Sequence, residues 1–316
     1  MFEIDESFYE PEIRWDFKVT TERKKIWARQ LEILAEFDRI CAKHGLSYWL
    51  DYGTLLGAVR HQGFIPWDDD LDVCMPRPDY DRASAIMQEE LGEPYEWVDL
   101  YTNLAKCTPE QITPAHMLPF AKIRNRMTTA IEPPAMPSVI NQGIWIDIFP
   151  LDDAYDDKDF TPEMHKIEKE LYVTAFGSPE MKEYIVSPGY ASATSKEDLQ
   201  NILDLPVIER FRIFEQIIGS LVGSSSLYVH KFYEILYQSK GYDKHYFDET
   251  VRIPFEGFMA PVPSRYHDLL TFWYGDYNIP VRANNHLAIY NADVSYLDYF
   301  RNPGKYKDTM KIGVDD

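Results

Sequence analysis

Apolar residues recur at three- and four-residue steps in several parts of the chain, which is the spacing of one face of a helix. The clearest case is residues 21–44, where a threonine can cap the start and Gly45 can end the helix. Shorter helices are predicted over 55–61 and 79–91. The core-facing stripe of the first helix would consist of Trp27, Leu31, Leu34 and Phe37.

Short apolar runs bounded by glycine, proline or acidic residues predict strands. Because such runs alternate with helices through the first half, we expect a mixed α/β (α+β) fold whose sheet is assembled early. The predicted strands cover residues 46–52 and 69–75 and lie near 96–101, 120–124 and 143–149.

Helical spacing dominates after the acidic residues 152–153, over 205–221 and 227–238, with a loop predicted over 187–195. An extended piece and then a helix at 264–274 follow within 255–280. No linker is long enough to separate domains. We therefore expect a single domain, 1–316, with a core over about 20–152, a helical elaboration over about 153–250 and a C-terminal segment over about 251–290.

Charge and composition narrow the classes of function. With 32 basic and 52 acidic residues the net charge is -20, which argues against nucleic acid as a partner and against simple electrostatic docking on anionic lipid. The three cysteines have no C-x-x-C spacing, so we expect reduced thiols. No signal peptide and no membrane-spanning run is evident, and the expected location is the cytoplasm, peripheral at the inner face of the membrane if contact is made.

An acidic run at residues 68–72 is the strongest chemical signal. In a strand, Asp70 and Asp72 would share one face while Leu71 and Val73 pack into the core. Two carboxylates held this close repel each other unless a cation lies between them, and an all-oxygen site suits Mg²⁺ or Mn²⁺. The alternative is a solvated acidic loop, which the interleaved apolar residues disfavour.

Two further segments bear on the same chemistry. Gly53 and Thr54 stand between a predicted strand and a helix, where unpaired N–H groups can hold a phosphate, and Arg60 could add a charged fork. Asp147 is the single charged residue of the apolar strand 143–149. It is either a structural carboxylate or the third acid of a phosphoryl-transfer centre, which holds a metal and receives a proton.

These segments closely resemble the LicD family of phosphotransferases, which has the nucleotidyltransferase fold and includes bacterial cholinephosphotransferases and the fukutin-type ribitol-phosphate transferases. The resemblance spans residues 20 to about 290 and is weak across the helical middle. The cysteine cluster that binds zinc in some fukutin-type members is absent here, which favours the bacterial branch. The matching segments are YGTLLGAVRHQGFIPWDDDLDV at 52–73, WIDIFPLD at 145–152, PFEGF at 254–258, PVP at 261–263 and YGDY at 274–277 with Pro280.

The resemblance implies residue roles. Asp70, Asp72 and Asp147 would be the catalytic and metal-binding acids, with Gly53 and Thr54 as the phosphate motif. Lys122 and Arg124 are candidates for the donor phosphates, although a structural salt bridge fits them equally. The aromatic residues Tyr48, Tyr52, Trp67 and Trp145 could surround a choline group or simply form core. Three histidines, His44, His61 and His286, have no assigned role.

The implied reaction is a metal-dependent transfer of a phospho-alcohol group, most simply phosphocholine from CDP-choline, to a sugar hydroxyl. The acceptor would be a glycan or lipid-linked saccharide of the cell surface, such as a teichoic acid or lipopolysaccharide precursor, which leaves room for transient membrane contact. Alternatives are a nucleotidyltransferase that uses an NTP and releases pyrophosphate, a catalytically idle cation-binding scaffold, and a metal-dependent glycosyltransferase.

Overall fold

The computed structural model describes residues 4–112, 117–154, 161–219, 227–236, 241–282 and 288–312. Both helices and strands are present, which confirms the predicted α/β class. No helix in these ranges combines the length and apolar character needed to cross a bilayer.

The chain divides into two compact units, each assembled from separate stretches of sequence. The second unit begins its main stretch at Pro150, close to the point where the sequence predicts the helical region. The first unit comprises residues 1–98, 121–149 and 246–316, and the second comprises 99–120 and 150–245.

Helix α1 (Thr21–His44) has the predicted bounds and caps. The Thr20 hydroxyl oxygen accepts a hydrogen bond from the Arg23 N–H at 3.2 Å, which satisfies one of the unpaired donors at the helix start. Gly45 ends the helix in the left-handed conformation, with φ of 60°, where glycine carries no steric penalty. The predicted stripe is buried along its whole length.

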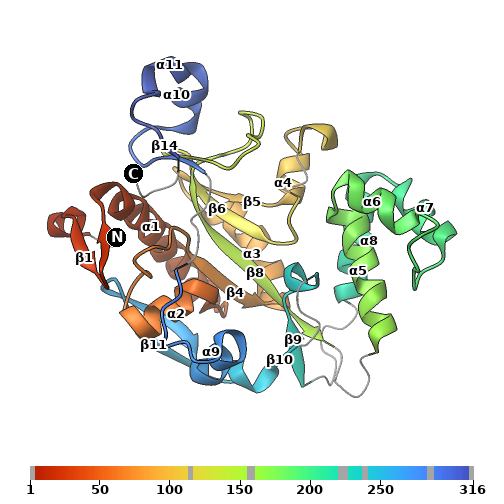
Figure 1. Ribbon diagram of the computed structural model, residues 1–316. Helices are drawn as coiled ribbons and strands as arrows, with labels where there is room; N and C mark the ends of the chain where they lie inside the picture. The colour runs from red at the N-terminus through yellow and green to blue at the C-terminus, as the bar shows by residue number, and fades with distance from the viewer. Residues whose placement is uncertain are drawn as a thin grey trace. The chain divides into compact units, whose positions relative to one another are not determined.

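A mixed sheet forms the centre of the first unit (Figure 1). Its order is β5-β6-β8-β4-β3, and helices α1 and α3 (Arg77–Glu90) pack against it and against each other. β8 enters the second unit after Phe149. The strands are β3 (Trp49–Leu50), β4 (Asp72–Pro76), β5 (Tyr95–Val98), β6 (Ala121–Asn125) and β8 (Ile144–Ala154).

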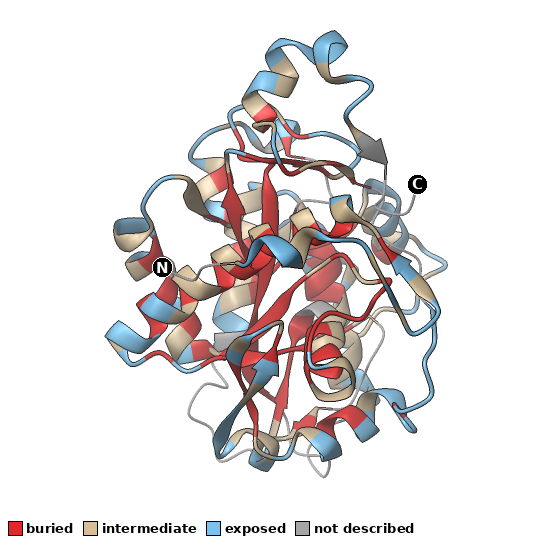
Figure 2. Ribbon diagram, turned by 90° about the vertical axis from the view of Figure 1, so that its left-hand side faces the viewer, coloured by how far each residue is buried: buried red, intermediate tan, exposed pale blue. Residues whose placement is uncertain are grey.

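Burial follows from this arrangement. Every residue of β6 and β8 is buried. Figure 2 shows buried residues in red along the strands of the sheet. A strand covered on both faces reads as a near-continuous apolar run, which explains why the segment 144–149 carries so little polarity.

The two early strands are shorter than predicted, and this corrects one premise of the site. β4 begins at Asp72, so Asp70 precedes the strand and does not share a strand face with Asp72. The reason lies in α1, whose side chains take the carbonyl groups of the acidic run. Trp27 Nε1 donates to the Asp68 carbonyl and Gln30 Nε2 to the Asp69 carbonyl, each at 2.9 Å.

The hairpin of β11 (Thr250–Phe255) and β12 (Phe258–Pro263) is formed by the C-terminal PFEGF motif. Its two turn residues, Glu256 and Gly257, have φ of 47° and 79°, as a two-residue hairpin turn requires. The Glu256 carboxylate accepts from the Phe64 N–H at 3.1 Å and pairs with Arg14. It therefore ties the hairpin to the loop after α2 (Tyr52–His61).

Smaller elements complete the first unit, including the predicted helix near 264–274, which is confirmed as α9 (Tyr266–Tyr274). The others are η1 (Glu6–Tyr9), β1 (Glu12–Arg14), β2 (Phe17–Val19), β7 (Thr129–Ile131), β13 (Ile289–Asn291), α10 (Tyr296–Arg301), α11 (Pro303–Tyr306) and β14 (Lys311–Ile312).

The second unit is mainly helical, with an aromatic core in which the Phe176 ring contacts Phe211 and Phe214. The predicted loop over 187–195 is confirmed. The elements of the second unit are α4 (Leu100–Leu104), η2 (Pro109–Gln111), α5 (Pro162–Phe176), α6 (Pro179–Val186), α7 (Lys196–Leu203), α8 (Val207–Gly219), β9 (Tyr228–His230), η4 (Phe232–Glu234) and β10 (Tyr242–Asp243). The 3-10 helix η5 (Lys244–Phe247) begins in the second unit and ends in the first.

The helix predicted over 227–238 is wrong. Strand β9 occupies its start, because Val229 pairs with Asp153 at the end of β8, and a 3-10 turn follows. Ladder pairing has overridden the helical spacing of the apolar residues. Residues 237–238, and 220–221 of the helix predicted over 205–221, lie outside the described residues.

Gly143 provides a test of the packing between β6 and β8. A Cβ at this position would lie 1.8 Å from the Asn125 carbonyl oxygen, so Gly143→Ala must push the two strands apart. We expect the free energy of unfolding to fall by about 1–3 kcal/mol or more in urea denaturation. Gly92→Ala is the matched control, because nothing lies within 4 Å of its Cβ. Equal stability of the two variants would contradict the close approach.

Candidate active site

Asp72 lies at the centre of an accumulation of negative charge in the first unit. Its side chain is almost fully buried, and this burial raises its pKa well above the usual value. The carboxylates of Asp70, Asp147, Asp51 and Asp68 raise the pKa further, in that order. Five acids that repel one another in a poorly hydrated region would be stabilised by a cation.

The predicted phosphate motif meets this acidic centre. The Thr54 hydroxyl oxygen accepts from the Asp72 N–H at 2.9 Å, and the Asp51 N–H donates to the Asp72 carbonyl at 3.0 Å. The first turn of α2 and the first residue of β4 are therefore fixed against each other. The N-terminus of α2 is thus adjacent to the acids, and a helix N-terminus is a favourable place for an anionic group such as a phosphate.

Gly53 leaves room for a neighbouring carboxylate. A Cβ on Gly53 would lie 2.6 Å from Asp68 Oδ2, so any larger residue would displace that acid. The preceding residue, Tyr52, has φ of 39° at the start of α2, a conformation that costs a residue with a side chain about 1–2 kcal/mol. Backbone strain of this kind is typical of functional sites.

Asp147 is held by two neighbours within the sheet. Lys122 stands opposite it in the β6–β8 ladder, and the Lys122 Nζ lies 2.7 Å from Asp147 Oδ1. The Trp145 indole N–H donates to Asp147 Oδ2 at 2.8 Å. Both carboxylate oxygens are thus engaged by side chains of the protein.

Trp145 is a buried platform under two cations. Its ring lies 4.3 Å from Lys122 Nζ and 4.8 Å from the Arg124 guanidinium carbon, and it stacks with Tyr290 at 6.2 Å. Arg124 in turn pairs with Glu132 at 2.5 Å. The two predicted phosphate-binding cations therefore make structural ion pairs here, and their contact with a donor stays a prediction.

Two predicted residues point away from the acidic centre. Arg60 is in the last turn of α2, about 10 Å along the helix from Gly53 at 1.5 Å per residue. Its guanidinium donates to the Tyr277 carbonyl at 2.6 Å. Trp67 is buried, and its indole N–H donates to the Val281 carbonyl at 3.2 Å. Both side chains attach the first motif to the C-terminal segment.

His44 and His61 make their contacts away from the acidic centre. His44 pairs with Glu90 at 2.6 Å at the end of α1. Burial lowers the pKa of His61 to about 4, and the charges of Arg60 and Arg14 lower it further, so the ring is neutral at pH 7. His286 lies outside the described residues.

Several residues near the centre were missed by the sequence analysis. Tyr290, from the C-terminal segment, donates its hydroxyl to Asp69 Oδ2 at 3.2 Å. The Tyr52 ring stacks with Trp273 and meets Phe149 edge-on, each at 5.3 Å between centroids. Asp51 and Asp68 adjoin the predicted motifs and were detectable from that position, whereas Tyr290 and Trp273 gave no local signal.

The carboxylates of the acidic centre partly fit the ligand requirements of a divalent cation. Among the described side chains, no group of three or more carboxylate, imidazole or thiol groups is placed to hold a metal ion. Asp70 and Asp72 together still suit Mg²⁺, which commonly binds through one or two carboxylates and completes its shell with substrate phosphates and water. Asp147 would first have to exchange its contact with Lys122.

A glycine–hydroxyl helix start therefore adjoins an acidic strand. Comparison with known proteins finds a family with a match to this same segment. The model of the LicD/FKTN/FKRP nucleotidyltransferase domain matches residues 45–102, which contain α2, the acidic run and β4. The predicted resemblance to the LicD family is therefore confirmed.

Named relatives extend the match beyond this segment. The lipopolysaccharide cholinephosphotransferase LicD of Haemophilus influenzae is 29% identical over 256 residues, which cover 78% of this chain and 88% of that protein. The human ribitol 5-phosphate transferase FKRP is 42% identical over 48 residues, 15% of this chain and 10% of that protein. An uncharacterised protein of Rickettsia prowazekii, RP689, is 38% identical over 79 residues, 24% of this chain and 29% of its own length.

The Lys122–Asp147 pair can be tested by removing one partner. Both side chains are buried, so Lys122→Met leaves an uncompensated carboxylate and should lower the free energy of unfolding by about 3–5 kcal/mol in urea. The double variant Lys122→Met/Asp147→Asn should recover much of this loss.

A matched control is Lys43→Met, since Lys43 pairs with Glu90 at an exposed position. It should cost under about 1 kcal/mol. If Lys122→Met loses no more free energy of unfolding than Lys43→Met, the Lys122–Asp147 ion pair is not a structural constraint.

Proposed function

We propose that the protein transfers phosphocholine, or a related phospho-alcohol group, from a CDP-linked donor to a sugar hydroxyl of a cell-surface glycan precursor such as a lipopolysaccharide or teichoic acid. The similarity to a lipopolysaccharide cholinephosphotransferase over most of both chains supports this class of reaction. The observation that carries the proposal is the 2.9 Å bond between the Asp72 N–H and Thr54, which joins a phosphate-binding helix start to the acids.

In this proposal Asp70 and Asp72 hold Mg²⁺ or Mn²⁺, with Asp147 as the third acid. A bound divalent ion would neutralise the pyrophosphate charge and stabilise the leaving CMP. The N–H groups at the start of α2 orient the transferred phosphate, and Lys122 adds a cation next to Asp147.

The transfer itself is a displacement at phosphorus. The sugar oxygen attacks the choline-bearing phosphorus, the bond from that phosphorus to the CMP oxygen breaks, and CMP leaves with the electron pair. We assign the proton of the sugar hydroxyl to Asp147, which the Trp145 indole N–H still orients after the carboxylate has exchanged its contact with Lys122. Positioning and electrostatics supply most of the rate.

The alcohol part of the CDP-linked donor, such as choline, would need a binding surface of its own. A quaternary ammonium is attracted to the faces of aromatic rings. Of the aromatic residues considered, Trp145 and Tyr48 are nearly fully buried, whereas Tyr52 is half-buried and stacks with Trp273. We therefore favour the Tyr52–Trp273 pair as the surface for choline.

Asp72→Asn tests the assignment. With Mg²⁺, CDP-choline and lipopolysaccharide acceptor, the variant should lose about 100-fold or more of the CMP release, equivalent to about 3 kcal/mol of transition-state stabilisation. Asp81→Asn, at an exposed position on α3, should keep its rate. Near-native turnover by a folded Asp72→Asn protein would overturn the proposal.

The choice of donor separates this reaction from nucleotidyl transfer. The same protein is incubated with Mg²⁺ and either CTP or CDP-choline, and with CDP-ribitol and CDP-glycerol. We expect CMP from one of the CDP-alcohols and no pyrophosphate from CTP. Pyrophosphate release from CTP would favour the nucleotidyltransferase alternative. The assay has to compare the donors because both reactions would use the same acids and helix start.

A further inference from the structure

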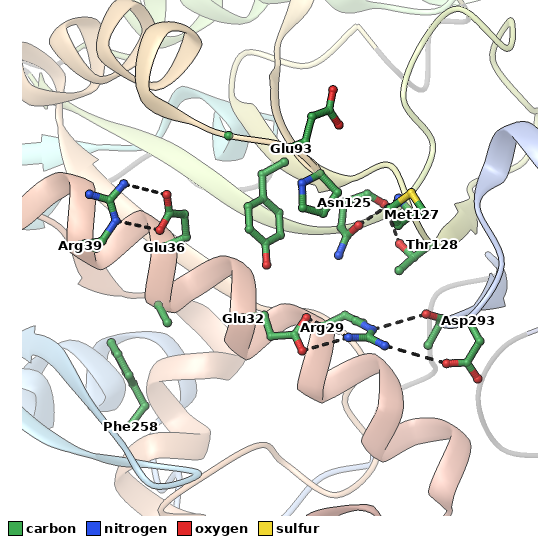
Figure 3. Close-up of a pocket in the computed structure, with 15 residues that line it drawn as sticks. Arg29, Glu32, Glu36, Arg39, Glu93, Asn125, Met127, Thr128, Phe258 and Asp293 are labelled. Carbon is green, nitrogen blue, oxygen red and sulfur yellow. Dashed lines mark hydrogen bonds and ion pairs between the residues drawn. The ribbon is translucent and has the colours of Figure 1, made fainter. Parts of the chain in front are cut away.

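A hollow in the first unit shares no residue with the acidic centre (Figure 3). Its volume is about 890 Å³, within the range of small-molecule binding sites. One wall is the outer face of α1, and the opposite wall comes from the turn before β5 and the turn after β6. In Figure 3, Arg29 and Glu32 on α1 face Asn125 across this hollow.

Hydrogen-bonding groups are built into its walls. Asn125 is only 4% exposed, and its carbonyl oxygen accepts from the Met127 N–H at 3.0 Å, which turns the amide nitrogen into the hollow. That nitrogen makes no hydrogen bond to another described residue, and it opens onto the hollow, where a ligand could accept a hydrogen bond from it.

Tyr95 adds a second group of this kind. Tyr95 lines the hollow, and its hydroxyl makes no hydrogen bond within the described part of the chain. Burial raises the pKa of Tyr95 to about 12, and the nearby Glu32 and Glu36 carboxylates raise it too, so the hydroxyl keeps its proton. Donors from Tyr95 and Asn125 therefore face acceptors from Glu32 and Glu36.

Charge and shape restrict what can bind. Four carboxylates and two arginines line the hollow, so an anionic ligand such as a phosphate or nucleotide is disfavoured. Arg29 is held by Glu32 at 2.9 Å, and Arg39 by Glu36 at 2.8 Å, which fixes planar polar groups in place. Pro94 and the Tyr95 ring provide apolar surface beside them.

We propose that this hollow binds a neutral saccharide. A sugar ring presents several hydroxyl groups, each both donor and acceptor, around an apolar C–H face, and the walls offer the matching set. In the transfer reaction the site would hold a sugar unit of the acceptor, a role that rests on the proposed function. Binding of the sugar itself does not depend on that function.

Saturation-transfer NMR on the full chain tests this directly, with methyl glucoside, methyl galactoside and N-acetylglucosamine as separate probes. At least one should receive saturation, and its Kd should rise about fivefold or more in Tyr95→Phe and in Glu32→Gln, as the loss of one hydrogen bond predicts. Tyr95→Phe keeps the ring and removes only the hydroxyl, so its fold should be unaffected.

Two controls separate this site from the acidic centre. Glu89→Gln, at an exposed position on α3, should bind the sugar as the unmodified protein does. Asp72→Asn should also bind it unchanged, so saccharide binding is read independently of the transfer reaction.

Three outcomes would overturn the proposal. The first is that none of the three sugars receives saturation. The second is that a sugar binds Tyr95→Phe and Glu32→Gln as tightly as it binds the unmodified protein. The third is that choline chloride binds and the two variants weaken its binding, whereas no sugar binds, which would identify a cation site.

Discussion

Mutual repulsion among the carboxylates around Asp72 is the constraint on which the rest of the first unit depends. Charges of one sign are costly to bury together, and each must be held in place by other contacts. Side chains of α1 hold the backbone carbonyls of Asp68 and Asp69, Tyr290 donates to the Asp69 carboxylate, and Lys122 balances Asp147. Helix, sheet and C-terminal segment are thus all recruited to one small region, and the fold keeps an electrostatic strain that a cation or a proton would relieve.

Local patterns predicted the parts of the fold that local chemistry determines. Helix α1 was predicted with its bounds and caps, because a threonine hydroxyl and a left-handed glycine are sufficient to begin and end it. The segment 227–238 was predicted incorrectly as helix, since pairing of Val229 with β8 depends on residues about 75 positions away in sequence. The shared strand face of Asp70 and Asp72 failed for the same kind of reason, because α1 captures the carbonyls that a strand would have used.

In the candidate site, too, local contacts were predictable from the sequence and contacts between distant segments were not. The sequence assigned Thr54 and Asp72 to the same phosphate and metal chemistry, and the bond from the Asp72 N–H to the Thr54 hydroxyl brings them together. Cross-strand partners are invisible to spacing, so the contact of Lys122 with Asp147 appears only in the register of β6 on β8. Arg60 could not be placed from its distance in sequence to Gly53, since two turns of helix carry it to the Tyr277 carbonyl instead.

The Glu256 carboxylate, which links the β11–β12 hairpin to the loop after α2, has a consequence for how the chain is made. The first unit cannot be closed while the ribosome is still translating the segment between residues 150 and 245. During that interval the acidic run lacks Tyr290, and the residue 63–64 loop lacks the carboxylate that binds it. The second unit, nearly continuous in sequence, is free to fold first, while the larger unit waits for contacts of high sequence separation. Nascent chains should therefore spend their longest exposure with the first unit incomplete.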